Sequence, residues 1–299
     1  MDPHTDLFQR HRSRLLGLAY RMLGTPADAE DVLHDAWLRW HAQDKTCLDD
    51  PEAWLVTVTT RLALDRLRHA KVEREHYTGP WLPEPLIESE DQPDTQAEQA
   101  ETLTMSFLLM LERLSAEERA AFLLHEVFDY SHAEAATILD ITEDACRQRV
   151  HRAKQRVRDE RTRFTVNAQT QRRLLERFAQ ALDQPTNENL HALFAEDAMH
   201  ISDGGGLATA TLRPLLGATR ITHLYLQVAK HEQDHHVQRR LHTLNDAPVL
   251  LTWVDGQLTT ATWIECDGER IVALHALRNP EKLARLAAVT KAEDGTSLH

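Results

Sequence analysis

The most constraining feature of the chain is a helix-turn-helix pattern between residues 131 and 163. Ser131 and Glu134 have the spacing of a capping box, which marks the start of a short helix. Asp140 interrupts that helix, and Thr142 is placed to cap a second one directly after the turn. Two helices joined by such a tight turn are typical of proteins that place the second helix in the major groove of DNA.

The second of these helices is the most basic stretch of an acidic protein. Between Ala145 and Arg163 the chain has eight basic and two acidic residues, although its formal net charge is −13. An acidic chain with one concentrated basic helix indicates contact with nucleic acid at a defined place, with a partner supplying most of the affinity. Apolar residues at helical spacing predict one buried stripe on this helix: Cys146, Val150, Ala153 and Val157.

Two further long helices are predicted within residues 5–75. Thr25 followed by Pro26 begins one of them, and Asp50 followed by Pro51 begins the other. Apolar residues recur at spacings of three and four, so each helix should bury one face. The first stripe comprises Ala29, Val32, Leu33, Ala36, Trp37 and Trp40, and the second includes Trp54, Leu55, Val58 and Leu62.

Residues 76–101 and 166–290 differ in character from the helical segments. The first range contains four prolines and a run of acidic residues, which predicts a linker, although Trp81 and Leu82 should dock rather than remain in water. In the second range, helices at 169–183 and 187–195 come first. Six β-rich runs follow: AMHIS, LATATL, VQRRLHTL, PVLLTWV, LTTATWIEC and RIVALHAL. A helical stretch, RPLLGATRITHLYLQVAK, separates the second run from the third. The predicted fold class is therefore multidomain: two all-α domains, then an α+β domain with a curved antiparallel sheet.

Composition restricts the location and chemistry of the chain. No apolar run approaches the roughly 20 residues of a membrane span, and MDPHTDLFQR lacks the pattern of a secretory signal. Cys47, Cys146 and Cys266 are too far apart to indicate a disulfide framework or a metal knuckle. We therefore expect a cytoplasmic protein with no cofactor and no metal.

One segment, from His231 to His235, matches the zinc-protease pattern HExxH. That chemistry requires both histidines on one stable helix and a third ligand, whereas this segment lies where a helix gives way to a strand. Because five-residue motifs arise by chance, we expect no metal site here. The helix-turn-helix argues against a purely enzymatic role, so we do not expect an enzyme. An isomerase or cyclase remains the enzymatic alternative, and it would need a pocket carboxylate such as Asp197 or Asp203.

Two segments of the chain resemble conserved regions of extracytoplasmic-function sigma factors. The stretch from Phe8 to Lys71, which includes LAYRMLGTPADAEDVLHDAWLRW and PEAWLVTVTTRLALDRLRHAK, resembles their region 2. The stretch LSAEERAAFLLHEVFDYSHAEAATILDITEDACRQRVHRAKQRVR resembles their region 4. The remainder resembles a subgroup with a SnoaL-like C-terminal extension, related in fold to ketosteroid isomerases. Three stretches carry this closer resemblance: YTGPWLPEPL in the linker, DGGG at 203–206 and NPEKL at 279–283.

The chain departs from the pattern of its relatives at three positions. Leu207 follows DGGG, where the subgroup usually has lysine, so any contact that needs a cation there is in doubt. Asp140 stands at a turn where region 4 commonly has glycine, which aspartate can replace. Arg61 stands where many relatives have asparagine.

The resemblance implies a sigma factor that binds core RNA polymerase, through its β′ and β subunits, and initiates transcription at promoter DNA. The helix from Asp28 to His41 would dock on the β′ coiled coil, with Asp28, Asp31, Asp35 and Trp37 at the contact. The next helix would read the melted minus-ten element through Arg61, Arg66, Arg68 and Lys71. Region 4 would read the minus-35 element, with Arg147, Gln148 and His151 at base edges and Arg149, Arg152 and Lys154 at phosphates.

For the C-terminal domain the resemblance implies direct control of the two sigma domains, and a small ligand in this domain stays open. The implied regulatory contacts are Trp81, Leu82, Pro83, Asp203, Gly204, Gly205, Gly206, Asn279 and Pro280. The expected domains are region 2 at 1–75, the linker at 76–101, region 4 at 102–165, the regulatory domain at 166–290 and a tail at 291–299. The alternative function is a DNA-binding regulator that acts without polymerase.

Overall fold

The computed structural model describes residues 3–43, 48–86, 104–164, 168–245 and 247–290. The chain divides into two compact units. The first comprises Met1–Glu75 and Glu88–Glu160, and the second comprises His76–Ile87 and Arg161–His299. The described start of the linker therefore belongs to the C-terminal unit, while the rest of the expected linker, from residue 87, and the expected tail lie outside the described residues.

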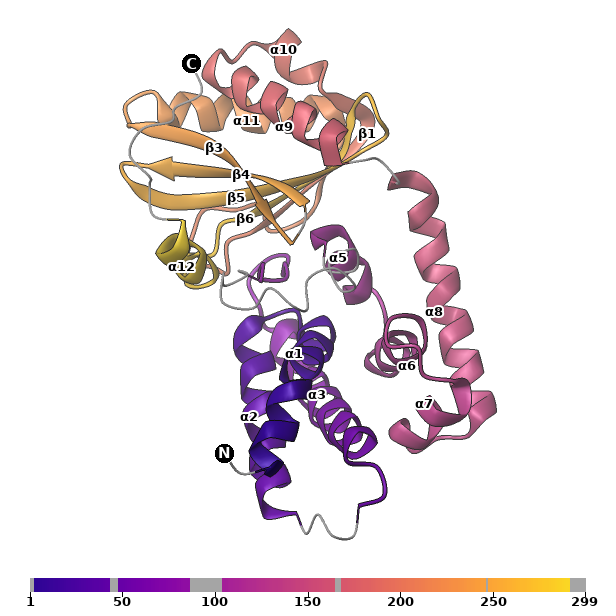
Figure 1. Cartoon of the computed structure of the whole chain (residues 1–299). Coiled ribbons are helices and arrows are strands. Elements are labelled where there is room, and N and C mark those ends of the chain that lie inside the picture. Colours follow the sequence, from indigo (N-terminus) through magenta and orange to yellow (C-terminus); the bar gives the residue numbers. More distant parts are fainter. Residues whose placement is uncertain (1–2, 44–47, 87–103, 165–167, 246, 291–299) are drawn as a thin grey trace. The chain divides into compact units, whose positions relative to one another are not determined.

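The described elements of the first unit are helices (Figure 1). The segment that resembles region 2 forms α1 (Pro3–Leu23), α2 (Pro26–Ala42) and α3 (Pro51–Glu75). The segment that resembles region 4 forms α5 (Met105–Glu112), α6 (Ala116–Glu126), α7 (His132–Leu139) and α8 (Glu143–Phe164), of which α8 belongs to this unit up to Glu160.

The predicted helix boundaries of this unit are confirmed by their capping geometry. The Thr25 hydroxyl accepts a hydrogen bond from the Asp28 amide at the start of α2. Capping boxes begin α6 at Ser115 and α7 at Ser131. At the end of α7, Asp140 has φ 56° and ψ 51°, a left-handed conformation that aspartate tolerates better than most residues. This residue turns the chain from α7 into α8 and so completes the helix-turn-helix.

The predicted buried stripe is right for α8 and partly wrong for α3. Cys146, Val150, Ala153 and Val157 of α8 are all buried. In α3, however, Trp54, Val58 and Leu62 are only half-buried. The residues buried on α3 are Leu55, Val56, Thr59, Thr60, Ala63, Leu64, Leu67 and Ala70. The difference arises because α3 packs against α1 and α2 and also against α6 and α7, so its buried surface is wider than one stripe.

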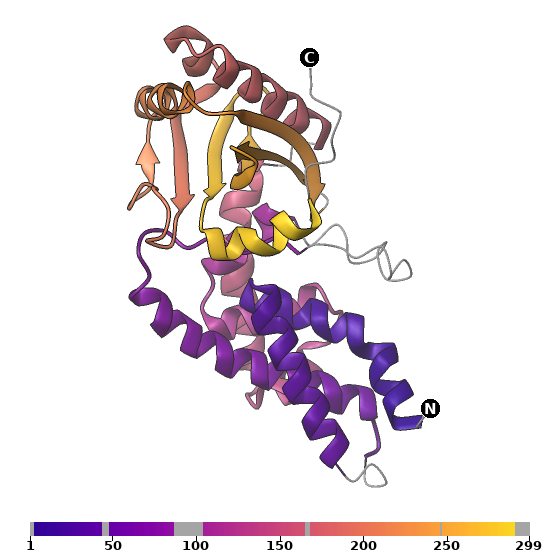
Figure 2. The same ribbon diagram turned by 90° about the vertical axis from the view of Figure 1, so that its left-hand side faces the viewer.

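The second unit is an α+β domain, which confirms the predicted fold class. Its helices are α9 (Ala168–Asp183), α10 (Asn187–His191), α11 (Ala218–Glu232) and α12 (Pro280–Val289). Its strands are β1 (Phe194–Asp203), β2 (Leu215–Leu216), β3 (Val237–Leu244), β4 (Ala247–Val254), β5 (Gln257–Cys266) and β6 (Ile271–Leu277), in the sheet order β2-β1-β6-β5-β4-β3. Figures 1 and 2 show α9 and α11 on one face of this sheet and α12 on the other.

Three details of the predicted sheet are wrong. The run LATATL is not a strand, because it follows a glycine turn in which the amides of Leu207 and Ala208 both donate to the Gly204 carbonyl. The predicted helix from residue 213 begins only at Ala218, since the preceding β2 pairs with β1. The sheet is not wholly antiparallel, because β1 runs parallel to β6.

An aromatic cluster occupies the core between the sheet and its helices. The ring of Phe178 on α9 lies edge-on to Tyr225 of α11, with 4.9 Å between centroids, and 6.1 Å from Phe194 of β1. All three side chains are buried. The core on this face of the sheet is thus built from large apolar side chains. None of the described helices combines the length and the apolar character of a membrane span.

Candidate functional site

The acidic residues predicted on α2 fall into two groups. Asp31 and Asp35 are exposed, one turn apart, and His34 lies between them on the same side of the helix. Asp28, in contrast, receives hydrogen bonds from the Thr25 hydroxyl at 2.6 Å and from Arg66 Nε at 2.9 Å. Asp28 therefore joins α2 to α3, while Asp31 and Asp35 remain accessible to a partner.

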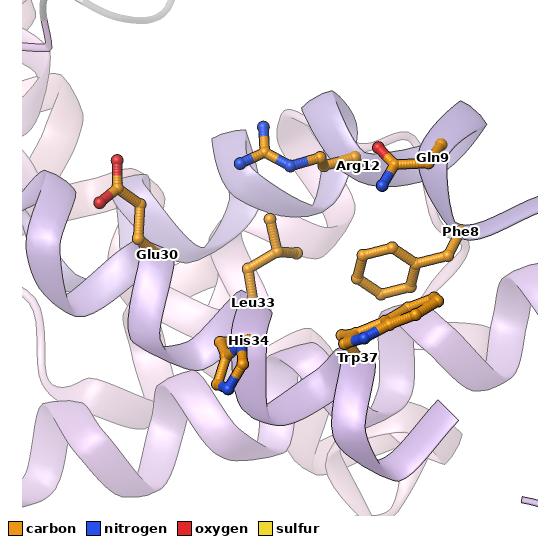
Figure 3. A pocket seen from close by; sticks show the side chains of 7 residues that line it. All are labelled: Phe8, Gln9, Arg12, Glu30, Leu33, His34 and Trp37. Carbon is orange, nitrogen blue, oxygen red and sulfur yellow. The ribbon is translucent and has the colours of Figure 1, made fainter. Parts of the chain in front are cut away.

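A recess of about 340 Å³ lies between α1 and α2, beside these acids (Figure 3). Its apolar walls are Phe8, Leu33 and Trp37, and the rings of Phe8 and Trp37 meet edge to face with 5.0 Å between centroids. Polar side chains complete the lining: Gln9, Arg12, Glu30 and His34. Trp37, expected to be wholly within the buried stripe, is only half-buried because one side of its ring faces this recess.

Three of the four cations predicted to read the minus-ten element are bound to region 4. Arg61 Nε donates to the Ile138 carbonyl at 3.1 Å, and Lys71 Nζ donates to the Leu114 carbonyl at 2.8 Å. Arg68 pairs with the Glu117 carboxylate at 3.0 Å. Burial, together with the neighbouring Arg119 guanidinium, lowers the pKa of the Lys71 ammonium. The fourth predicted cation, Arg66, pairs with Asp28 and Glu73.

The basic helix α8 leaves its predicted base-reading side chains on the surface. Arg147, Gln148 and His151 are exposed, and Arg147 forms an ion pair with Glu143 one turn earlier. The predicted phosphate contacts differ among themselves. Arg149 is half-buried, while exposed Arg152 and Lys154 pair with Glu118 and Glu126 of α6, at 3.1 and 2.7 Å.

In the C-terminal unit, the linker residues and the DGGG motif meet at the buried carboxylate of Asp203. This side chain is fully buried at the end of β1. It accepts hydrogen bonds from the Tyr77 hydroxyl at 2.6 Å, the Leu82 amide at 2.9 Å and Lys282 Nζ at 2.8 Å. Burial and the hydrogen bond to Asp203 raise the pKa of the Tyr77 phenol. Two linker residues and one residue of α12 thus converge on one acid.

Lys282 is the residue through which α12 makes most of its contacts in this cluster. Its ammonium also donates to the Leu82 carbonyl at 2.7 Å and lies 4.1 Å from the centroid of the Trp81 ring. Asn279, the cap of α12, donates through Nδ2 to the Tyr77 hydroxyl at 2.9 Å. Of the other predicted contacts, Pro83 is buried and Pro280 is exposed in the first turn of α12.

The three glycines after Asp203 provide the space that this cluster needs. A Cβ atom on Gly205 would lie 2.3 Å from Asn279 Nδ2, and one on Gly204 would lie 2.3 Å from the Ala208 carbonyl oxygen. At Gly206 the nearest atoms, 3.1 Å away, belong to Thr78 of the linker. DGGG is therefore a close-approach site for the linker rather than a loose hairpin loop.

We call residues 77–86 the strap, because their backbone is held to the C-terminal domain at two separate points. Asp203 binds the Leu82 amide, and Asn245, between β3 and β4, accepts a hydrogen bond from the Leu86 amide at 3.0 Å. These partners lie at opposite sides of the sheet, since β1 is next to the β2 edge and β3 forms the other edge. Leu82, Pro83 and Pro85 are buried along the way. Trp81 and Leu82 thus dock as the sequence predicted.

Two residues of the cluster, Tyr77 and Lys282, were not among the predicted contacts. Both stand inside the stretches YTGPWLPEPL and NPEKL, so the resemblance contained a signal for them. The structure also explains how the chain does without a lysine after DGGG. Leu207 is 58% exposed and makes no contribution to the cluster, whereas Lys282 delivers a cation to Asp203 from another element.

The side chains of the HExxH segment form contacts within the C-terminal domain. Helix α11 ends at Glu232, so the two histidines do not share a helix, and the Glu232 carboxylate pairs with Arg239 of β3. His235 Nδ1 pairs with Asp255 at 2.7 Å. Among the described residues, no group of three or more potential ligands could hold a metal ion. Of the two carboxylates considered for an isomerase, Asp203 is occupied by the strap and Asp197 is exposed.

Comparison with known proteins agrees with this arrangement. The family model for sigma-70 region 2 matches residues 7–72, and the model for sigma-70 region 4 matches residues 104–157. The ECF RNA polymerase sigma factor SigJ of Mycobacterium tuberculosis is 36% identical over 222 residues, covering 73% of this chain and 71% of the relative. The probable ECF sigma factor SigI of the same species is 27% identical over 292 residues, covering 96% and 97%.

The similarity extends to the fold of the whole chain. The crystal structure of Mycobacterium tuberculosis SigJ matches with a TM-score of 0.73 and 30% identity, covering 94% of this chain and 98% of SigJ. A region 2 helical domain, a region 4 helix-turn-helix and a C-terminal α+β domain occur here in one chain. This chain therefore belongs to the extracytoplasmic-function sigma factors of RNA polymerase.

Proposed function

We propose that this sigma factor docks on core polymerase through α2 and reads the minus-35 promoter element through α8. The exposed trio of Arg147, Gln148 and His151 at the start of the basic helix carries the proposal, because its members face solvent on one helix of a helix-turn-helix. A bidentate arginine–guanine pair is worth about 1–3 kcal/mol. Such a factor would work in the cytoplasm, with polymerase and promoter DNA.

Run-off transcription with core polymerase tests this proposal. Wild-type protein should direct synthesis from its cognate promoter, and Arg147→Ala should reduce that synthesis roughly tenfold or more, in line with the energy of one base contact. Gln155→Ala is the matched control, because Gln155 is also exposed on α8 but is not a predicted contact. Tight promoter binding by the chain without polymerase would instead support the alternative of an independent DNA-binding regulator.

We further infer that region 2 can read the minus-ten element only after it separates from region 4. The support is the pairing described above, in which Arg61 is bound to α7, Arg68 to α6 and Lys71 to Leu114, two residues before α6. Spin labels on His69→Cys in α3 and Ala133→Cys in α7, both exposed positions, would report the separation in a Cys47→Ser background. Their distance should lengthen when polymerase and promoter are added, and an unchanged distance in an active complex would refute the idea.

The C-terminal domain is proposed to set the activity of the factor by holding the strap. The support is the cluster at Asp203, which fixes the chain immediately after α3. Trp81→Ala should change the promoter output, while Leu216→Ala, a change at an exposed residue of β2 in the same domain, should not. Equal output from both variants would remove this role of the strap.

A further inference from the structure

We propose that Asp144 is a specificity-determining residue of the basic helix α8, and that Asp144 and Arg147 together read one G·C base pair of the minus-35 element. This inference rests on the proposed reading of promoter DNA by α8 and deepens it, because it names the base pair that is read. Asp144 is not among the base contacts that the sequence predicts. An exposed acid on a basic helix repels phosphates, so Asp144 does not add to general affinity for DNA.

Asp144 lies on the side of α8 that faces away from the core of its helical unit. Asp144, Gln148 and His151 follow each other at spacings of four and three residues, so they form one stripe along the helix, and all three are exposed. The buried stripe of α8, which includes Cys146 and Val150, lies on the other side. In helix-turn-helix proteins the N-terminal residues of the second helix contact base edges, so Asp144 stands beside two predicted base contacts in that part of α8.

The two acids in the first turn of α8 differ in what their carboxylates can still bind. The Glu143 carboxylate accepts a hydrogen bond from Arg147 Nη2, and the Glu143 side chain is 44% exposed. The Asp144 side chain is 87% exposed, and its Oδ1 lies 3.7 Å from Arg147 Nη1, which is beyond hydrogen-bonding distance. Glu143 therefore holds the Arg147 guanidinium in place, while Asp144 presents an accessible acceptor beside it.

A guanidinium beside a carboxylate matches the major-groove edge of a G·C pair. Guanine presents two acceptors there, N7 and O6, and its cytosine presents the N4 amino group as a donor. O6 and N4 are hydrogen-bonded to each other across the pair, so they lie about 3 Å apart. That spacing is close to the 3.7 Å between Arg147 Nη1 and Asp144 Oδ1. Because a guanidinium has five N–H donors and Glu143 occupies one of them, enough donors remain for a bidentate contact with guanine.

The same two side chains disfavour the other base pairs. At an A·T pair the adenine amino group meets the Arg147 donors, and thymine O4, an acceptor, meets the Asp144 carboxylate. Reversal of the pair to C·G places the cytosine amino group against Arg147 and the guanine acceptors against Asp144. Asp144 thus contributes to specificity by exclusion as well as by attraction, and it lowers the affinity for the phosphate backbone.

Selection of promoter sequences by the full chain with core polymerase tests whether one G·C pair is read by both residues. From a promoter library with a randomised minus-35 element, the wild-type complex should enrich a G·C pair at one position. Arg147→Ala and Asp144→Ala should each lower the preference for G·C at that same position by about tenfold, as expected for the loss of one base contact. Gln155→Ala, a change at an exposed residue further along α8, should leave the preference unchanged.

Two modified bases test the contacts at single atoms of the selected pair. N4-methylcytosine keeps the Watson–Crick hydrogen bond but replaces the amino hydrogen that faces the major groove, and 7-deazaguanine lacks the N7 acceptor. N4-methylcytosine should weaken promoter binding by the wild-type complex about tenfold, and it should change binding by Asp144→Ala less than about twofold. 7-Deazaguanine should likewise weaken the wild-type complex and leave Arg147→Ala nearly unchanged.

Asp144→Asn separates base reading from helix stability. Aspartate in a first helical turn also stabilises the helix through its dipole, and both Asp144→Asn and Asp144→Ala lose that charge. Only asparagine keeps an acceptor oxygen, so N4-methylcytosine should still weaken promoter binding by Asp144→Asn.

Three results would overturn the proposal: an enriched element without a G·C pair, equal sensitivity of wild type and Asp144→Ala to N4-methylcytosine, or dependence of Asp144 and Arg147 on different base pairs. Failure of the proposed function has a different signature, because the wild-type complex would then enrich no minus-35 sequence at all.

Discussion

Replacing Lys282 by methionine should release the strap from the C-terminal domain. The side chain of Lys282 is 7% exposed and that of Asp203 is fully buried, so the change leaves an uncompensated carboxylate with only the Tyr77 hydroxyl and the Leu82 amide as partners. Removing one member of a buried ion pair costs about 3–5 kcal/mol. Because about 1.4 kcal/mol is a tenfold change in an equilibrium, the released state should become roughly a hundred- to a few-thousand-fold more populated.

Hydrogen exchange of the Leu82 amide measures this release, because the amide is bonded to Asp203 in the docked strap. Its exchange should accelerate by that factor in Lys282→Met while the amides of β4 keep their protection. Lys230→Met is the control, since Lys230 is an exposed lysine of the same domain. The double variant Lys282→Met with Asp203→Asn should recover much of the loss, because no charge is left buried alone. A Leu82 exchange rate within about threefold of wild type in a folded Lys282→Met protein would refute the reasoning.

Three further predictions concern stability. Gly205→Ala should lower the free energy of unfolding in urea by about 1–3 kcal/mol more than Gly256→Ala. Both glycines have positive φ, but only at Gly205 would the new Cβ collide, at 2.3 Å from Asn279 Nδ2. Equal losses of stability would show that Asn279 can move aside. Ser131→Ala should destabilise region 4 by about 1 kcal/mol through loss of the capping box, read from its thermal unfolding, with Ala133→Ser as the control for a change at an exposed position. Burial, with smaller contributions from His275 and Arg278, lowers the pKa of His200 to about 4. In the unfolded chain this histidine takes up a proton near pH 6.5, whereas in the folded domain it stays neutral until about pH 4. The free energy of unfolding should therefore fall by up to about 3 kcal/mol between pH 6.5 and 4, and His200→Leu should flatten that part of the pH curve. A slope unchanged in the His200 variant would contradict the assignment.

Elements with strong local signals were predictable from the sequence. The capping box at Ser131, the turn at Asp140 and the apolar period of α8 depend only on neighbouring residues, and the structure reproduces them. The buried face of α3 was not predictable in the same way, because its burial depends on two packing partners that are distant in sequence. The run LATATL has β propensity, but the glycines before it turn the chain and the sheet offers it no partner.

The candidate site shows the same division between local and distant information. The resemblance brought Trp81, Leu82 and the DGGG motif together, and the structure places them in one cluster. It pointed to the stretch NPEKL but not to Lys282 as the cation that compensates Asp203, because that pairing depends on how two distant elements pack. Likewise, the arginine-rich end of α3 was visible in the sequence, whereas its pairing with region 4 depends on tertiary packing.

The contacts between regions 2 and 4 suggest an order of events in initiation. The pair formed by Arg68 and Glu117 is half-exposed and worth about 0.2–1 kcal/mol. At Arg61 and Lys71, a DNA phosphate would replace a neutral carbonyl acceptor with a charged one. These exchanges are close to balanced. Arg119 differs, because its guanidinium is fully buried and bonds the Met22 carbonyl at 2.7 Å and Glu112 at 2.8 Å. Separating the regions must expose this charge network, and DNA contacts of α3 do not compensate for it. If α3 reads the minus-ten element as proposed, the free energy for the separation comes from docking on polymerase, and polymerase binding precedes minus-ten recognition.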